Sequence, residues 1–289
     1  MKTKVNNRYR QTDESLSLSA GREQTRLPAL LLILSIISIV FLVFVGGGLF
    51  FFPVSWRPIW LWSLTPFNIR FLGAIYLTSL VALLSLVLAR KAALIRLIVP
   101  MMWVFTTVVT LVSCLHLEQF DANRTTTDIW FWLYLVDCVG ASYYLGYFKQ
   151  KSFEGLYRLP LGWSIGLGLQ AGLLGAYGLG LLIFPETTSS SWTWPLDIFH
   201  ARLYSSIFLT GAIGSAILSR RAKSIECTAL GVIQATFSGL VLAGVWIVDR
   251  EVDKIDWSLS SNWVWLGAIA LLGIVGVGLT QQMNPKSRH

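Results

Sequence analysis

Asp137 is the one acidic residue that falls inside a long apolar stretch of this chain. A charged group inside hydrocarbon costs at least about 2.5 kcal/mol on insertion scales, so such a residue usually has a partner or a function. Counted along a helix, Asp137 lies roughly 10 Å into its stretch, and Gln170 and Gln234 lie roughly 12 Å and 10 Å into theirs. The three side chains could therefore converge at one depth. Their polarity fits hydrogen bonds between helices or the lining of a ligand path.

Two polar pairs at the starts of apolar stretches form a second candidate site. Asn68 and Arg70 recur 132 positions later as His200 and Arg202. An exposed helix N-terminus beside an Arg favours an anion, such as the phosphate of a lipid headgroup. The same Arg could instead reach toward the headgroup region and fix the depth of its helix.

The spacing of 132 residues belongs to a repeat that covers most of the chain. The other residues that recur at it are Phe52, Pro53, Leu77, Thr78, Lys91, Phe105, Val109 and Asp121, which match Phe184, Pro185, Leu209, Thr210, Lys223, Phe237, Val241 and Asp253. Trp130, Trp132, Leu133 and Gly140 recur 133 positions later as Trp263, Trp265, Leu266 and Gly273, which pairs Asp137 with Ala270. A duplicated apolar unit of this length predicts two copies of one membrane-embedded helix bundle.

Composition indicates a protein with many membrane crossings. Apolar residues make up 54% of the chain and charged residues only 13%, which water would not keep dispersed. Eight apolar stretches are long enough, or nearly so, to cross a hydrocarbon core of about 30 Å. They cover 29–52, 71–89, 97–117, 129–148, 162–184, 200–219, 227–248 and 263–281. The predicted fold class is an all-α membrane protein with eight transmembrane helices, as two tandem repeats of four.

The positions of Lys and Arg predict the orientation. With a cytoplasmic N-terminus, 17 of the 23 Lys and Arg fall on the inner side, and each inner segment is richer in them than its outer neighbours. This is the positive-inside pattern, so both termini should be cytoplasmic. Because each repeat has an even number of crossings, the two repeats should be parallel.

The predicted organisation has four parts. A disordered cytoplasmic tail covers 1–26, the first four-helix repeat 27–158, the second repeat 159–283, and a second cytoplasmic tail 284–289. The net charge of +8 is spread over separate inner segments and forms no single basic face, so nucleic acid is not an expected partner.

Tryptophan is concentrated on the predicted outer side. Eleven of the 13 Trp fall there, and nine of them form a predicted outer aromatic surface: Trp56, Trp60, Trp62, Trp130, Trp132, Trp192, Trp194, Trp263 and Trp265. A plain aromatic belt would populate both interfaces. The equivalent segments 54–65 and 186–195 should lie along the outer surface. They could anchor the protein, or they could receive a lipid, a hydrophobic ligand or a partner protein.

Glycine spacing in the fifth stretch suggests close helix packing. Gly162 and Gly166, and also Gly168 and Gly172, have the GxxxG spacing that lets two helix backbones approach in lipid. The expected role of these residues is packing within the bundle. The same packing role is expected of further glycines in the first and fifth stretches: Gly46, Gly47, Gly48, Gly175, Gly178 and Gly180.

The segment 62–77, a Trp- and Pro-rich stretch before a helix that starts near Arg70, resembles a segment of uncharacterised prokaryotic multi-pass membrane proteins. Within it, Thr65 and Pro66 have the order of a helix N-cap followed by Pro at the first helical position. The resemblance covers about sixteen residues and implies a bacterial or cyanobacterial source. It implies no activity. Because of the implied source, the expected location is the bacterial plasma membrane, or the thylakoid membrane of a cyanobacterium.

No sequence motif names a reaction. The chain contains no HExxH, P-loop, GxSxG or CxxC motif. We therefore expect a non-catalytic membrane subunit, or a module that binds lipids or a membrane-protein partner. A first alternative is a transporter that moves a lipid or small amphiphile between the repeats. A second is a membrane enzyme or cofactor-binding protein that uses His116, His200 and Glu118, with the cofactor unknown.

Overall fold

The computed structural model describes residues 27–89, 92–149, 153 and 155–282, and it is helical throughout apart from short connections. Eight helices of this part have 23 residues or more: α2 (Ala29–Phe51), α4 (Pro66–Ala89), α5 (Ala92–Leu115), α6 (Thr125–Lys149), α7 (Leu161–Ile183), α9 (Ile198–Arg220), α10 (Ser224–Val252) and α11 (Ser260–Gln282). The predicted tails, 1–26 and 284–289, lie outside the described residues.

Seven of these helices are long and apolar enough to cross a membrane. The prediction of a multi-pass, all-α membrane protein is confirmed to this extent. Helix α6 contains the predicted stretch 129–148 but does not belong to the seven. It carries Asp128 and Asp137 among several hydroxyl side chains, which lower its hydropathy.

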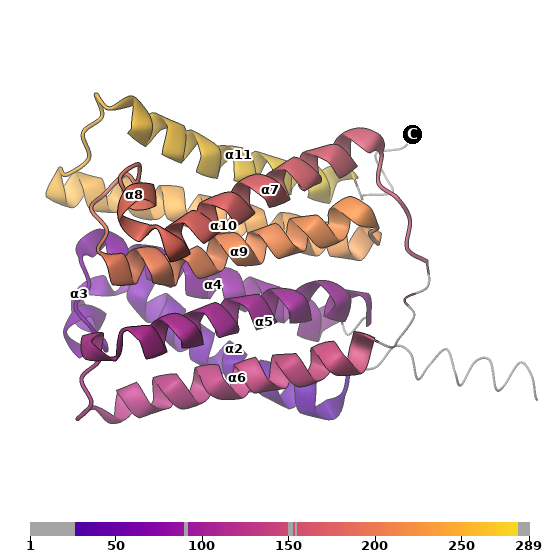
Figure 1. The fold of residues 1–289 in the computed structure, drawn as a ribbon, viewed down its shortest axis with the longest axis horizontal. Coiled ribbons are helices and arrows are strands. Elements are labelled where there is room, and N and C mark those ends of the chain that lie inside the picture. The colour runs from indigo at the N-terminus through magenta and orange to yellow at the C-terminus, as the bar shows by residue number, and fades with distance from the viewer. Residues whose placement is uncertain (1–26, 90–91, 150–152, 154, 283–289) are drawn as a thin grey trace, which may run out of the picture.

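All long helices run roughly along one direction, and the helices of the second half lie beside those of the first, above them in Figure 1. Within the first half α2 packs on α4 and α5 on α6, and within the second α7 packs on α9 and α10 on α11. The halves meet because α4 packs on α10 and α5 packs on α9. Since α4 touches α5 less than it touches α10, the segments 27–158 and 159–283 share one core of four central helices.

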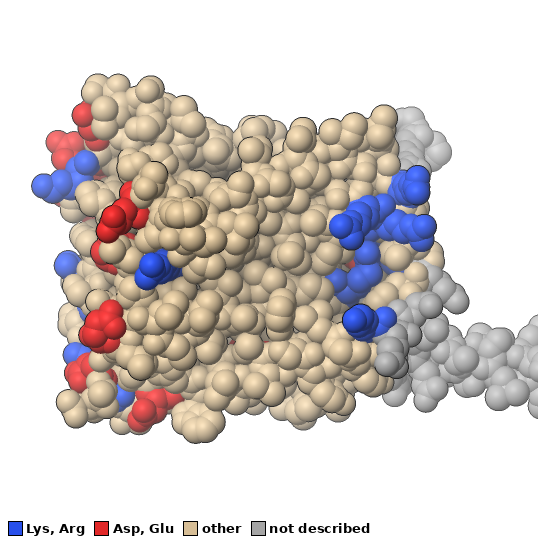
Figure 2. Space-filling view, viewed as in Figure 1, with Lys and Arg blue, Asp and Glu red and all other residues tan. Residues whose placement is uncertain are grey.

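The two ends of the bundle differ in their charges. Short helices α3 (Pro53–Trp56) and α8 (Pro185–Ser189) lie at the left end in Figure 1, which we call the tryptophan end. At the opposite end α2 begins and α11 ends (Figure 1). We call it the arginine end, because Arg96, Arg158, Arg220 and Arg221 line one groove there. Figure 2 shows charged side chains at both ends and an uncharged band between them. This distribution suits a bilayer, whose core disfavours charge.

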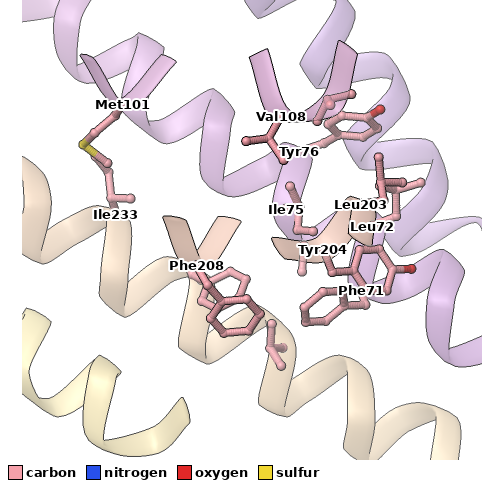
Figure 3. Packing of buried hydrophobic residues seen from close by; sticks show 14 of the residues in the cluster. Phe71, Leu72, Ile75, Tyr76, Met101, Val108, Leu203, Tyr204, Phe208 and Ile233 are labelled. Carbon is pink, nitrogen blue, oxygen red and sulfur yellow. The ribbon is translucent and has the colours of Figure 1, made fainter. Parts of the chain in front are cut away.

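The core between the halves is rich in aromatic side chains. Phe71 of α4 lies beside Tyr204 of α9 across the interface, and Tyr76 and Phe208 belong to the same buried cluster (Figure 3). The rings of Phe71 and Tyr204 lie 4.6 Å apart, and Tyr76 and Tyr204 are almost fully buried. Large rings give this contact more buried area than aliphatic side chains of the same number would.

Glycine allows close helix contacts at some of the predicted positions. A Cβ on Gly46 would lie 3.0 Å from Tyr76 and one on Gly178 2.8 Å from Leu209, so close packing is confirmed at these two. A Cβ added to Gly162, Gly166, Gly168 or Gly172 would meet nothing within 4 Å, so the prediction that these four pack helices is wrong. The α10 and α11 backbones cross instead at Gly231 and Gly276. A Cβ on Gly276 would lie 2.6 Å from the carbonyl oxygen of Gly231, and one on Gly231 would overlap the carbonyl oxygen of Gly276.

We predict that Gly231→Ala lowers the free energy of unfolding by about 1–3 kcal/mol, because α10 and α11 must separate to admit the methyl group. Gly239→Ala in the same helix is the matched control, since a Cβ there meets nothing within 4 Å. It should leave stability unchanged or raise it by about 0.5–1 kcal/mol. The melting temperatures of both purified variants in detergent test this, and equal losses would contradict the crossing.

Candidate functional site

Helices α4 and α9 begin with side-chain caps at positions 132 residues apart, Thr65 and Asp197. Thr65 Oγ1 accepts a hydrogen bond from the backbone N–H of Asn68 at 3.2 Å, and α4 begins at Pro66, so the predicted cap is confirmed. The Asp197 side chain accepts from the N–H of His200 at 2.8 Å in the same way. These caps hold Asn68 and His200 in the first turn of their helices.

Asn68 and His200 each bind a tryptophan of the other half. Trp62 Nε1 donates to His200 Nε2 at 3.0 Å, and Trp194 Nε1 donates to Asn68 Oδ1 at 2.9 Å. Both acceptor residues are buried, since Asn68 is 1% exposed and His200 is 3% exposed. Since Trp194 and His200 lie 132 positions after Trp62 and Asn68, the two bonds form one reciprocal contact between the halves.

The second ring nitrogen of His200 is also occupied. His200 Nε2 accepts a hydrogen bond, so the ring proton is on Nδ1. This N–H donates a hydrogen bond to Asp197 Oδ2. Burial raises the pKa of the Asp197 carboxyl, but the hydrogen bonds from the His200 side chain and backbone outweigh this and hold the pKa below its usual value of 3.8. The hydrogen bond between Asp197 and His200 therefore stabilises the fold at pH values above 3.8, the usual pKa of this carboxyl. This stabilisation is lost as the pH falls through the lower pKa of Asp197 in the folded protein.

Most of the predicted outer aromatic surface is an aromatic interior. Six of its nine Trp are buried, with at most 7% of their surface exposed: Trp60, Trp62, Trp130, Trp192, Trp194 and Trp265. Only Trp132 and Trp263 are largely exposed, at 67% and 59%, and Trp56 is half-buried. The buried rings pack against each other at the tryptophan end, as in the pair of Trp62 and Trp130 with centroids 5.0 Å apart.

These contacts correct the pairing of the last helices. Trp130 packs on Trp60 and Trp62, and Trp265 packs on the equivalent Trp192 and Trp194. Trp130 therefore corresponds to Trp265, an offset of 135, whereas the sequence comparison paired it with Trp263. The segment from Asp253 to α11 is three residues longer than that from Asp121 to α6, which explains the change. Asp137 then corresponds to Leu272, not to Ala270.

Arg70 and Arg202 make equivalent contacts with the ends of neighbouring helices. Arg70 donates to the carbonyl of Phe50 at 2.8 Å and lies 3.6 Å from Glu251. Arg202 donates to the carbonyl of Leu182 at 3.3 Å and to His116 Nε2 at 3.0 Å. Both guanidinium groups thus have protein partners. Headgroup binding by Asn68, Arg70, His200 and Arg202 stays a prediction.

His116 and His200 make separate contacts. His116 Nδ1 lies 3.1 Å from Glu118, and its Nε2 accepts from Arg202. His200 binds Trp62 and Asp197, and Phe199 packs against both imidazoles. In this arrangement neither histidine has a ring nitrogen free for a shared ligand.

Two of the three mid-depth polar side chains converge. Gln170 and Gln234 both approach Ser215 Oγ, with Nε2 at 2.8 Å and 3.5 Å. Asp137 lies elsewhere, and the Ser38 hydroxyl donates to its two carboxylate oxygens at 3.4 Å and 3.3 Å. The similar depths of Asp137, Gln170 and Gln234 along their helices had suggested that the three would meet. Only Gln170 and Gln234 do, because Asp137 faces Ser38 of α2 instead.

Asp137 lines a cavity of about 80 Å³. One water needs roughly 10–15 Å³ in this measure, so the cavity has room for several water-sized groups. Four residues with hydroxyl groups belong to its lining, Ser38, Tyr76, Thr106 and Tyr134, and the wall is mostly apolar. Ser38 was not among the predicted site residues. Its signal is that Ser35 and Ser38 are the only two polar side chains of α2, which carries no charged residue.

A cavity of about 40 Å³ lies at the equivalent place in the second half. Leu174, Phe208, Gly211, Gln234 and Leu272 line it where Leu42, Tyr76, Ser79, Met102 and Asp137 line the first. Thr78 and Thr210 belong to both. The two cavities therefore share a plan, but only the first has a carboxyl group in its wall.

The chain matches no family model, and comparisons with curated proteins and with solved structures also found no match.

Proposed function

We propose that the chain is a non-catalytic integral membrane protein that binds a small ligand in the Asp137 cavity. The ligand is mostly apolar and carries one positive charge or hydrogen-bond donor. The observation that carries this proposal is the wall of the cavity, where Asp137 lies among mostly apolar residues and its carboxylate has the Ser38 hydroxyl as its hydrogen-bond partner. Buried carboxylates are costly unless they are paired, and a cationic ligand would supply the second partner.

Aromatic side chains beside Asp137 support a cationic ligand group. Tyr76, Phe105 and Tyr134 line the same cavity, and ring faces attract ammonium groups. Tyr134 Oη donates to Tyr76 Oη at 3.2 Å, so the two phenols are held together. An amine of a few heavy atoms would meet both the carboxylate and the rings.

The proposed architecture is two parallel copies of one four-helix unit with eight crossings, α6 included, and cytoplasmic termini. Helices α7, α9 and α10 each begin 132 residues after α2, α4 and α5, which supports the duplication. Helix α6 packs along α5 and extends from one end of the bundle to the other (Figure 1), which supports a crossing. The proposed location is a bacterial plasma membrane, and the partners are lipids and a membrane protein.

We expect a small molecule to co-purify with the protein and to depend on Asp137. Asp137→Asn keeps the shape of the side chain but removes its charge, so a cationic ligand should be lost. Leu272→Met changes the equivalent position of the second cavity while conserving volume and should keep the ligand. Native mass spectrometry of the three gently purified proteins makes the comparison. A preparation without a bound small molecule, or equal amounts in wild type and Asp137→Asn, would contradict the proposal.

One observation supports a second candidate, a carrier of a small amphiphile between the repeats. Ile207, Thr210 and Ile233 of the second half complete the wall of the Asp137 cavity, so relative movement of the halves would change its access. In liposomes that contain the purified protein, carriage predicts ligand uptake that Asp137→Asn abolishes, whereas a binding module gives no uptake.

A further inference from the structure

The arginine end has a groove of about 970 Å³ whose wall contains four arginines. Arg96 comes from α5, Arg158 from the segment before α7, Arg220 from the last turn of α9, and Arg221 directly follows α9. Figure 2 shows Lys and Arg side chains clustered at this end.

A backbone contact holds two of these arginines side by side. Tyr157 and Ala222 exchange hydrogen bonds in both directions, at 3.1 Å and 2.9 Å. Their chain neighbours Arg158 and Arg221 are therefore fixed on the same rim. The groove thus has a built frame, which loose surface cations lack.

Three of the four positive charges are not neutralised by a described carboxylate. Arg96 is paired with the fully buried Glu226, at 2.8 Å and 2.6 Å, and also donates to the carbonyl of Arg221 at 2.7 Å. No carboxylate of the described residues lies within ion-pair distance of Arg158, Arg220 or Arg221, and all three are exposed. An anion could therefore enter and meet three guanidinium groups.

The rest of the groove is apolar and continues toward the middle of the bundle. Pro100, Leu161, Ile213 and Ile217 line it, and Ile213 lies roughly 10 Å along the helix axis from Arg220. A molecule that fills the groove would have an anionic head at the rim and a hydrocarbon chain along α9.

We propose that this groove binds one anionic phospholipid, with the phosphate held by Arg158, Arg220 and Arg221 and an acyl chain against Ile213 and Ile217. Guanidinium groups bind phosphate oxygens through paired N–H donors. Basic pockets between transmembrane helices on the cytoplasmic side are a recurrent form of lipid recognition. This inference does not depend on a ligand in the Asp137 cavity.

Native mass spectrometry of the full chain tests the proposal, with phosphatidylglycerol as the probe and phosphatidylcholine as the uncharged comparison. Wild type should retain one phosphatidylglycerol in preference to phosphatidylcholine. Replacing Arg158, Arg220 and Arg221 together by Gln should weaken its binding by at least about tenfold, since each cation near a lipid surface contributes about 1 kcal/mol. The same three positions replaced by Lys keep the net charge but lose the paired donors, so binding should fall, and by less than in the Gln variant.

A control at the tryptophan end removes the same number of charges. Arg57, Arg250 and Lys254 replaced together by Gln should leave phosphatidylglycerol retention unchanged. Equal loss in the two Gln variants would overturn the proposal, because net charge would then explain binding. Displacement of the lipid by millimolar inorganic phosphate or glycerol phosphate would also overturn it, since the site would then take a free anion. Both variants are compared only as monodisperse fractions, and the Lys variant decides the result if the Gln variant does not fold.

Discussion

Replacing Arg96 by Met should lower the free energy of unfolding by about 3–5 kcal/mol, because it leaves a buried carboxylate without its partner. Glu226 has no exposed side-chain surface, and the guanidinium group of Arg96 contacts both of its carboxylate oxygens. The same carboxylate accepts from the backbone N–H of Lys223 at 2.7 Å, which caps α10. Arg96 therefore ties the start of α5 to the start of α10. The melting temperature of the purified protein in detergent measures the loss.

Two further variants separate the ion pair from general damage. Replacing both residues, Arg96→Met with Glu226→Met, should recover a large part of the lost stability, since no buried charge remains. Arg57→Met, which removes an exposed arginine without an ion pair among the described residues, should change stability by less than about 0.5 kcal/mol. Arg96→Met with a melting temperature equal to that of Arg57→Met would show that the pair contributes nothing.

Trp62→Ala should destabilise the protein by about 3–5 kcal/mol, and Trp194→Ala by a similar amount. Each change removes a buried ring from the tryptophan end and leaves its acceptor in the other half, His200 or Asn68, without a donor. A buried acceptor without a partner adds about 1–3 kcal/mol to the cost of lost packing. Size-exclusion chromatography after heating follows the fraction of each variant that stays monodisperse.

Trp132→Ala is the matched control for this interface. Its ring is 67% exposed on α6, so its loss should cost far less than the loss of Trp62. Trp62→Phe keeps most of the ring but removes the donor, so it isolates the hydrogen bond and should cost about 1–3 kcal/mol. If all three variants melt together, the tryptophan end does not hold the two halves.

Positions along the helices could be predicted from the sequence. The apolar stretch 71–89 and its end at the arginine side follow from hydropathy alone. Helix α4 nevertheless begins earlier, at Pro66, because a helix starts where its first N–H groups are capped. The polar residues Asn68 and Arg70 placed the predicted start of the apolar stretch after them, at residue 71. Both nevertheless lie within the first turns of α4.

Directions around the helices could not be predicted in the same way. Asp137, Gln170 and Gln234 have similar depths, but only the two Gln approach Ser215. Which side chains meet depends on how α7, α9 and α10 pack, because packing decides which face of each helix turns toward the others. The tryptophans were expected at one end, and they are there. Their burial depends on contacts between residues more than 100 positions apart, such as Trp62 with His200, which no local pattern contains.

The proposed duplication indicates where the candidate site should be sought. Reciprocal contacts of Trp62 and Trp194 make the tryptophan end nearly the same in both halves. The cavities depart from this symmetry, since Tyr76, Ser79 and Asp137 of one correspond to Phe208, Gly211 and Leu272 of the other. Support of the fold alone does not require Tyr76, Ser79 and Asp137 in a cavity wall. The Asp137 cavity is therefore the better candidate for a ligand.

An experimental density map of the gently purified protein tests the central claim most directly. The binding proposal predicts non-protein density in the cavity beside Tyr76 and Tyr134, within hydrogen-bond distance of the Asp137 carboxylate, and no matching density beside Leu272. A map that resolves the side chains of Ser38 and Asp137 but shows an empty cavity, or a protein side chain that fills it, would contradict the claim.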